Sequence, residues 1–333
     1  MPWIVLAVVL VAAVVLLAGR RSLDPDVVRE RLADLPKNAA LSAFPLSTAE
    51  FRLARQGGAL ALELTWLRLA RPGAPRLVLV HGTPGTLYNW SRLVAGGTGL
   101  DGQHLERGLV DDFDLTLVEL PGHGLSRDSL EHVDFALLAD ALGELLAHLD
   151  LGPVTLVAHS YGGEAAWRLA LDRPELLSDL VLVDSAGQPR ADDEWLPEEV
   201  KLREWSVAGW GWLLNSPERV HEALVPHFRG PVPDELSREF FLSCAHAGHW
   251  RAMMHLARDE NGSRADELPL LTVPTLLVWG ADDVAYPVER FARRFLDAIP
   301  GAELELIEDC GHYPHEERPA ALAALLRQRF ANR

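Results

Sequence analysis

The sequence predicts an α/β protein built on a mostly parallel sheet with helices on both faces. Short apolar runs alternate with amphipathic stretches along most of the chain, a pattern typical of buried strands and the helices that cover them. The runs 154–157 and 273–280 are rich in Val and Leu, as expected for strands buried on both faces. The chain has 333 residues, of which 48% are hydrophobic, enough to bury one large core and carry an insertion.

The elements follow in order along the chain. A hairpin of Ala49–Arg55 and Leu60–Leu69, with Gly57 and Gly58 between the strands, opens the sheet. The apolar runs 76–80, 115–118, 154–157, 180–183, 273–280 and 302–307 are expected as further strands. Helices are expected over 134–149, 163–171, 288–298 and 319–330, and the glycine-rich stretch 95–112 as a loop.

Ser160 stands between a predicted strand, 154–157, and a predicted helix, 164–171. A serine on such a sharp strand-to-helix turn is a nucleophile elbow, which exposes its hydroxyl at the carboxyl end of the sheet. Bulky neighbours would collide across the turn, which explains Ala158 two residues before and Gly162 two residues after. The usual signature is G-x-S-x-G, and alanine at its first position is acceptable where a positive φ is not needed.

A serine hydroxyl needs a base to activate it, and the base needs an acid to orient it. After the elbow, the strand 273–280 leads to Asp283, and the strand 302–307 leads to Gly311 and His312. Upstream, the strand 76–80 ends in a turn rich in Gly and Pro, which could offer a backbone N–H to a developing oxyanion. A second tight turn, Pro121-Gly122-His123-Gly124, follows the strand 115–118.

These motifs together resemble the α/β-hydrolase superfamily, of the kind that carries a lid. Four of them occur in the family's order: His81-Gly82-x-Pro84-Gly85, Pro121-Gly122-His123-Gly124-x-Ser126, the elbow at Ser160, and Asp283 with Gly311-His312. The resemblance covers roughly residues 50 to 331. It implies an α/β-hydrolase fold in which the triad residues follow the order nucleophile, acid, base.

By this resemblance, Ser160 is the nucleophile, Asp283 the acid and His312 the general base. The oxyanion hole would consist of the backbone N–H groups of Thr83 and Tyr161. Lining and structural roles are expected for the four residues next to these groups, which are His81, Gly82, His159 and Gly162. His81 usually braces the oxyanion loop in relatives, whereas His159 could shape the pocket or pack.

Some nearby residues compete for these roles. Asp282 could replace Asp283 if the loop slipped by one residue, and Asp184, after the strand 180–183, could be the acid in a variant arrangement. We expect Asp184 instead to cap its turn by bonding neighbouring N–H groups. His315 lacks the preceding glycine and is expected at the surface, and Cys244 and Cys310 are expected as free thiols.

The segment between the strands ending at residue 183 and starting at residue 273 is long enough for a helical lid. We expect the lid at 188–268 and the α/β-hydrolase core at 43–187 and 269–333. Half of the ten tryptophans of the chain fall in this lid, and they either anchor it to the core or form an aromatic acyl pocket. They are Trp195, Trp205, Trp210, Trp212 and Trp250.

The N-terminal run Trp3–Gly19 is uncharged and almost wholly apolar, and Arg20-Arg21 follow it. Its length is near the lower limit of about 17 residues that cross a bilayer, and it lacks the basic start and small-residue cleavage site of a signal peptide. We expect a membrane-anchor helix at 1–20 and a tether at 21–42, with cleavage for export as the alternative. The arginine pair favours a cytoplasmic catalytic domain.

The net charge of −17 argues against nucleic acid and anionic lipid as electrostatic partners. No zinc or phosphate-loop pattern occurs, so no cofactor or metal is expected.

We expect a serine hydrolase of carboxylic esters with apolar or lipid-like acyl groups, acting through an acyl-enzyme. The alternatives are a C–C bond hydrolase of vinylogous diketones, a peptidase or amidase, and a binding protein on a hydrolase scaffold. Dehalogenases and epoxide hydrolases of the family use a carboxylate at the elbow, where this chain has serine.

Overall fold

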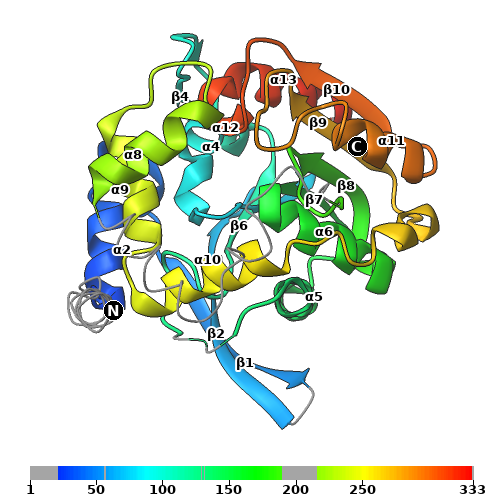
Figure 1. Cartoon of the computed structure of the whole chain (residues 1–333), viewed down its shortest axis with the longest axis horizontal. Helices are drawn as coiled ribbons and strands as arrows, with labels where there is room; N and C mark the ends of the chain where they lie inside the picture. The colour runs from blue at the N-terminus through cyan, green and yellow to red at the C-terminus, as the bar shows by residue number, and fades with distance from the viewer. Residues whose placement is uncertain (1–21, 56–57, 129, 131, 190–215, 332–333) are drawn as a thin grey trace, which may run out of the picture.

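An eight-stranded sheet forms the centre of the protein in a computed structural model that describes residues 22–55, 58–128, 130, 132–189 and 216–331 (Figure 1). The strands lie in the order β1-β2-β6-β3-β7-β8-β9-β10. β1 pairs with β2, and β2 with β6, in antiparallel fashion, and the other neighbours are parallel. The bounds are β1 Leu46–Arg55, β2 Gly58–Leu69, β3 Arg76–Val80, β6 Asp114–Glu119, β7 Val154–His159, β8 Leu177–Val183, β9 Thr275–Gly280 and β10 Glu303–Ile307.

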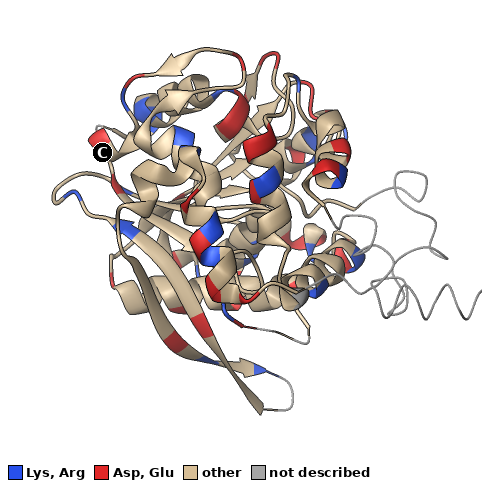
Figure 2. Ribbon diagram, turned by 90° about the vertical axis from the view of Figure 1, so that its left-hand side faces the viewer, with Lys and Arg blue, Asp and Glu red and all other residues tan. Residues whose placement is uncertain are grey.

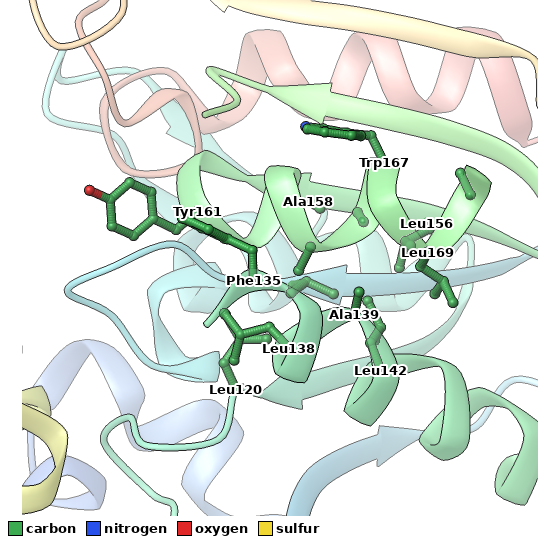
Figure 3. Close-up of a cluster of buried hydrophobic side chains, with 14 of the residues drawn as sticks. Leu120, Phe135, Leu138, Ala139, Leu142, Leu156, Ala158, Tyr161, Trp167 and Leu169 are labelled. Atoms are coloured by element: carbon green, nitrogen blue, oxygen red, sulfur yellow. The ribbon is translucent and has the colours of Figure 1, made fainter. Parts of the chain in front are cut away.

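Side chains alternate along the strands and form two apolar cores, one on each face of the sheet. In β3, Val78 and Val80 belong to one buried apolar cluster, and Leu77 and Leu79 to the other, because successive side chains point to opposite faces. Figure 3 shows the first cluster, where α5 (Phe135–Leu149) and α6 (Ser160–Asp172) pack on the sheet. On the other face, α13 (Pro319–Phe330) and the short α4 (Ser91–Ala95) bury their apolar side chains.

The mostly parallel sheet with helices on its faces confirms the predicted fold class. α13 has the predicted bounds, and α5 begins one residue after the Asp134 cap, which accepts a hydrogen bond from the Leu137 N–H at 2.6 Å. The helix predicted from residue 288 begins later, as α11 (Ala292–Ala298), because the N–H groups of Arg290 and Phe291 both bond to the Pro287 carbonyl in a preceding turn. The predicted loop 95–112 contains two-residue strands, β4 (Gly97–Thr98) and β5 (His104–Leu105), and the turn η3 (Leu109–Asp111).

The segment expected as a tether differs from that expectation. Its described part forms α2 (Pro25–Ala33), η1 (Pro36–Asn38) and α3 (Ala39–Ser42). Val28 and Leu32 are four residues apart and therefore share one face of α2, where both are fully buried. α2 lies beside α9 of the inserted segment (Figure 1). Apolar packing therefore holds this stretch in place, although its charged residues suggested a linker.

The predicted anchor at 1–20 lies outside the described residues. Within the part of the chain that the structure describes, no helix combines the length and apolar character needed to cross a membrane. Asp, Glu, Lys and Arg occur on most outer helices and on the projecting β1–β2 hairpin (Figure 2).

The insertion between β8 and β9 is helical in its described part, which begins at Ser216. It contains α8 (Pro217–Leu224), η5 (Val225–His227), α9 (Asp234–Ser243), α10 (Ala247–Asp259) and η6 (Ala265–Leu270). Trp250 of α10 is buried in a small cluster with Cys244, Met253 and Met254. The other four lid tryptophans, Trp195, Trp205, Trp210 and Trp212, lie outside the described residues.

Candidate active site

Ser160 is the first residue of α6 and directly follows β7. Its φ of 52° lies in the left-handed region, which non-glycine residues adopt only where the surroundings hold them there. The side chain is buried together with those of His312 and Asp283. The local sequence therefore forms a strained strand-to-helix turn at the predicted nucleophile.

The small residues around Ser160 are required by close backbone contacts. A Cβ on Gly162 would lie 2.2 Å from the His81 carbonyl oxygen, so no larger residue fits there without moving the oxyanion loop. Ala158, which replaces the usual glycine, is fully buried in β7 and does not have a positive φ. Alanine at that position therefore costs no backbone strain.

The structure brings the three predicted triad side chains into one hydrogen-bonded chain. His312 Nε2 lies 3.1 Å from Ser160 Oγ, and His312 Nδ1 lies 2.8 Å from Asp283 Oδ2. Because a carboxylate only accepts, Nδ1 carries the proton and Nε2 is left to accept the serine proton. Burial alone would raise the pKa of Asp283, but the neighbouring His312 and hydrogen bonds from backbone N–H groups hold it below its usual value.

Backbone contacts on both sides fix the loop that carries His312. Its N–H donates to the carbonyl of His227 in the lid at 2.8 Å, and its carbonyl accepts from His159 Nε2 at 2.7 Å. The buried Glu317 carboxylate accepts from the N–H groups of Gly311 and Tyr313, the two neighbours of His312. The base is thus held by the lid, the elbow and a carboxylate five residues further along the chain.

The loop after β3 reaches the elbow closely. A Cβ on Gly82 would lie 2.7 Å from the Ser160 Cβ, so glycine is what allows this approach. The backbones of Thr83 and Tyr161, the two predicted oxyanion donors, directly follow Gly82 and Ser160. This is the relative position of loop and elbow that the oxyanion-hole prediction requires.

Two neutral histidines brace this loop. His81 Nε2 accepts the Leu120 N–H at 3.1 Å, and burial lowers the pKa of His81 to about 3. His123 Nδ1 lies 3.0 Å from the Pro121 carbonyl, which only accepts, so Nε2 accepts from the Thr83 hydroxyl at 2.6 Å. Burial lowers the pKa of His123 to about 4. Both rings therefore stay uncharged at neutral pH.

The competing residues take other positions. Asp282 is exposed and forms an ion pair with Arg229 at 3.0 Å, so it does not face the base. Asp184 does not bond N–H groups next to it in sequence: its Oδ1 accepts from Gly280 on the adjacent strand β9 at 2.9 Å.

The expectation that His315 lies at the surface is wrong, because its ring is buried between Trp90 and His159, each with a centroid 4.6 Å away. Cys244 and Cys310 are buried, and neither forms a disulfide.

Only one group of three potential metal ligands lies close together in the described parts of the chain: Asp184, Asp283 and His312, within 4.8 Å of one another. Two of these three form the acid–base pair. A cation at that point would compete with the His312–Asp283 hydrogen bond, so the geometry suits proton transfer better than metal binding.

A model of the alpha/beta hydrolase family matches residues 77–325. The chain belongs to the α/β-hydrolase family. This α/β-hydrolase is 27% identical to the uncharacterized hydrolase YugF of Bacillus subtilis strain 168 over 254 residues, 76% of this chain and 88% of YugF. It is also 27% identical to human monoacylglycerol lipase ABHD6 over 267 residues, 77% of this chain and 75% of the lipase. The crystal structure of a bacterial membrane phospholipase A has a TM-score of 0.68 and 24% identity, covering 98% of this chain and 97% of that one.

Sequence reasoning missed several contacts around the site of this α/β-hydrolase. His123 stood in a recognised motif, but its bond to Thr83 joins loops 40 residues apart. The lid residue Glu260 accepts from the hydroxyls of Tyr161 and Tyr286, each at 2.8 Å. In Figure 3 the Tyr161 hydroxyl points away from the apolar cluster that holds its ring. No local pattern marks Glu260, because its partners come from the first turn of α6 and from the loop after β9, both distant in sequence.

Proposed function

We propose that this protein is a serine hydrolase that cleaves carboxylic esters with apolar, lipid-like acyl groups. The observation that carries the proposal is the chain of two hydrogen bonds from Ser160 through His312 to Asp283. Ester hydrolysis is the simplest chemistry that such a chain performs next to a pair of backbone oxyanion donors. Membership of a family with esterases and lipases among its members supports it.

In the proposed mechanism, Ser160 Oγ attacks the ester carbonyl carbon while its proton passes to His312 Nε2. The carbonyl oxygen becomes an oxyanion, which the N–H groups of Thr83 and Tyr161 stabilise; each donor contributes on the order of 10²–10³ in rate. His312 then protonates the departing alkoxide, leaving an acyl group on Ser160. Water attacks this acyl-enzyme with His312 again as base, releasing the acid and restoring the serine.

Lipid-like substrates are favoured by the apolar character of the lid. Trp250, Met253 and Met254 of α10 form an apolar cluster, and thioether and indole side chains suit flexible acyl chains. The monoacylglycerol lipase among the relatives supports the same substrate class.

A C–C bond hydrolase of vinylogous diketones is less well supported, because its substrate carboxylate would need a cation near the elbow. Arg168 is already bonded to Glu164 at 2.6 Å and to Ser263 at 2.9 Å, and Arg251 is exposed. Glu260 instead places an acidic side chain against Tyr161. The acidic side chain would repel a substrate carboxylate but not a neutral ester.

Substitution of Ser160 by alanine tests the proposal. Ser160→Ala should abolish hydrolysis of p-nitrophenyl esters and labelling by a fluorophosphonate probe, while circular dichroism and the melting temperature stay unchanged. Ser185→Ala is the matched control, because this buried serine donates only to the Ala186 carbonyl. Ester turnover by Ser160→Ala at the rate of the unsubstituted protein would remove Ser160 from the mechanism.

We further propose that residues 1–20 anchor the enzyme in a membrane with the catalytic domain on the cytoplasmic side, on the apolar sequence and the following arginine pair. The full chain should sediment with membranes, and a chain beginning at Ser22, which keeps α2, should remain in the supernatant. Equal distribution of the two chains would exclude the anchor.

A further inference from the structure

Asp184 is a buried acid directly after β8, and the mechanism above gives it no role. Its side chain is fully buried, and its φ of 44° lies in the left-handed region. Its N–H donates to the Val278 carbonyl at 3.0 Å, and its Oδ1 accepts from the Gly280 N–H at 2.9 Å. These bonds to β9 hold the carboxyl group in one orientation at the carboxyl end of the sheet.

In this orientation Asp184 contacts the catalytic acid. Carboxyl oxygens of Asp184 and Asp283 and a ring nitrogen of His312 lie within 4.8 Å of one another. At this separation the two carboxyl groups can form a hydrogen bond with each other. Two carboxyl groups can share a hydrogen bond only if one of them carries a proton, because an ionised carboxylate has no donor.

The hydrogen-bond partners decide which of the two carries the proton. Asp283 accepts from the N–H groups of Ala285 and Tyr286 and from His312 Nδ1, so donors surround its negative charge. Asp184 accepts from one N–H group, and its Oδ2 has no donor among the described residues. A buried carboxylate oxygen without a donor is costly, and protonation removes that cost.

The charges around the pair agree with this assignment. Burial, followed by the neighbouring Asp283, raises the pKa of Asp184 well above its usual value. The pKa of Asp283 is held low, since the nearby His312 offsets the effect of burial. The donor pattern and the charges thus both favour a single proton on the pair, held by Asp184.

We propose that Asp184 is a neutral carboxylic acid that donates a hydrogen bond to the Asp283 carboxylate and so positions the catalytic acid. Asp184 is a positioning residue in this account, because it acts on the base only through Asp283. The inference rests on the proposed serine-hydrolase function. It predicts that exchange for asparagine leaves kcat almost unchanged at Asp184 but lowers it strongly at the neighbouring Asp283.

Exchange of each aspartate for asparagine tests the proposal. In Asp184→Asn, the amide oxygen can still accept from Gly280 and the amide NH₂ can still donate to Asp283, so kcat should stay close to that of the unsubstituted enzyme. In Asp283→Asn, the amide no longer holds the required tautomer of His312, and kcat should fall by on the order of 10⁴-fold. A comparable loss in both would show that Asp184 acts as an ionised group and would overturn the proposal.

A second variant removes the hydrogen bond. Asp184→Leu keeps the approximate shape without a donor, and kcat for p-nitrophenyl esters should fall about 10- to 100-fold with KM little changed, in line with the loss of a hydrogen bond to a charged group. Asp179→Asn, which alters a buried aspartate on the same strand, β8, is the matched control and should keep full activity. Full activity of a folded Asp184→Leu would show that the donor is dispensable.

Infrared spectroscopy tests the protonation state without relying on any substrate. The difference spectrum between the unsubstituted protein and Asp184→Asn at pH 7 should contain the carbonyl stretch of a protonated carboxyl group. Its absence would overturn the proposal even if Asp184→Leu fails to fold. If no ester is hydrolysed but the band is present, the proposed function fails while the protonation of Asp184 stands.

Discussion

Two clusters of buried polar side chains lie in this protein, and they are built in opposite ways. In one, Lys37 Nζ lies 2.7 Å from carboxylate oxygens of both Glu239 and Glu316, all essentially inaccessible to solvent. In the other, Ser160, His312 and Asp283 form a chain of two hydrogen bonds. The first cluster holds a lysine against two buried carboxyl groups, whereas in the second the proposed mechanism moves a proton.

The difference follows from what each cluster connects. Lys37 belongs to η1, Glu239 to the lid helix α9, and Glu316 to α12 (Pro314–Glu317), just beyond His312. Glu316 also bonds to Arg92 at 2.8 Å. These contacts thus join the N-terminal segment, the lid and the core.

The largest effect on stability is expected from Lys37→Met. Removal of the cation leaves two buried carboxylates facing each other, which should cost about 3–5 kcal/mol of unfolding free energy. Urea unfolding at pH 7 measures it. Arg264→Ala is the control: it breaks half-exposed ion pairs with Asp172 and Glu267 and should cost less than about 1 kcal/mol. Equal losses would mean that the Lys37 cluster is not a structural lock.

A smaller effect is expected from Thr83→Val, which leaves the buried His123 Nε2 without its hydroxyl donor. The loss should be about 1–3 kcal/mol of stability. Ester turnover should also fall, because the missing hydrogen bond no longer holds the loop that carries the predicted Thr83 N–H donor. Thr83→Ser keeps the hydroxyl and should restore both. Turnover and stability in Thr83→Val that match those of Thr83→Ser would show that the hydroxyl has no role.

The smallest effect concerns pH and a third kind of buried group, a carboxyl with backbone donors. Glu119 accepts from the N–H groups of Leu87 and Leu125, and burial raises its pKa to about 8. Because the pKa of Glu119 is higher in the folded protein than in the unfolded chain, protonation of Glu119 stabilises the folded state at low pH. This contribution to the unfolding free energy is lost as the pH rises toward 8. Between pH 6.5 and pH 8, the unfolding free energy of the unsubstituted protein should therefore fall by on the order of 1–2 kcal/mol more than that of Glu119→Gln.

Urea unfolding at the two pH values checks this expectation. Glu164, whose pKa burial also raises to about 8, is present in both proteins, so its contribution cancels. His81 and His123 are also present in both proteins, so the change in their charge on unfolding cancels as well. Identical pH dependence of the two proteins would show that Glu119 is already ionised at pH 6.5.

The elements that could be predicted from sequence are those with a local cause. The elbow at Ser160 depends on its immediate neighbours, and the strands depend on continuous apolar runs. Asp283 could be distinguished from Asp282 only by motif spacing, and the structure adds the reason: one carboxylate is buried against His312 and the other pairs with Arg229.

The features that escaped prediction depend on contacts between distant segments. His315 looked exposed because the apolar residues that bury it, such as Trp90, come from another part of the chain. The segment 22–42 looked like a tether because its partners are distant in sequence, in the lid and in the core, as in the hydrogen bond from Arg29 Nε to the Leu125 carbonyl. Asp184 looked like a turn cap because its acceptor role toward Gly280 spans 96 residues. Pairings of this kind leave no periodic signal.

The hydrogen bond from the His312 N–H to the His227 carbonyl has a consequence for evolution and engineering. The insertion between β8 and β9 holds the loop that carries His312, so in the proposed mechanism the insertion and the core cannot be exchanged as separate modules. A grafted insertion from another enzyme would have to present a carbonyl at the same point, or turnover would fall for every substrate alike. Changes of specificity are therefore best sought in α10, away from η5.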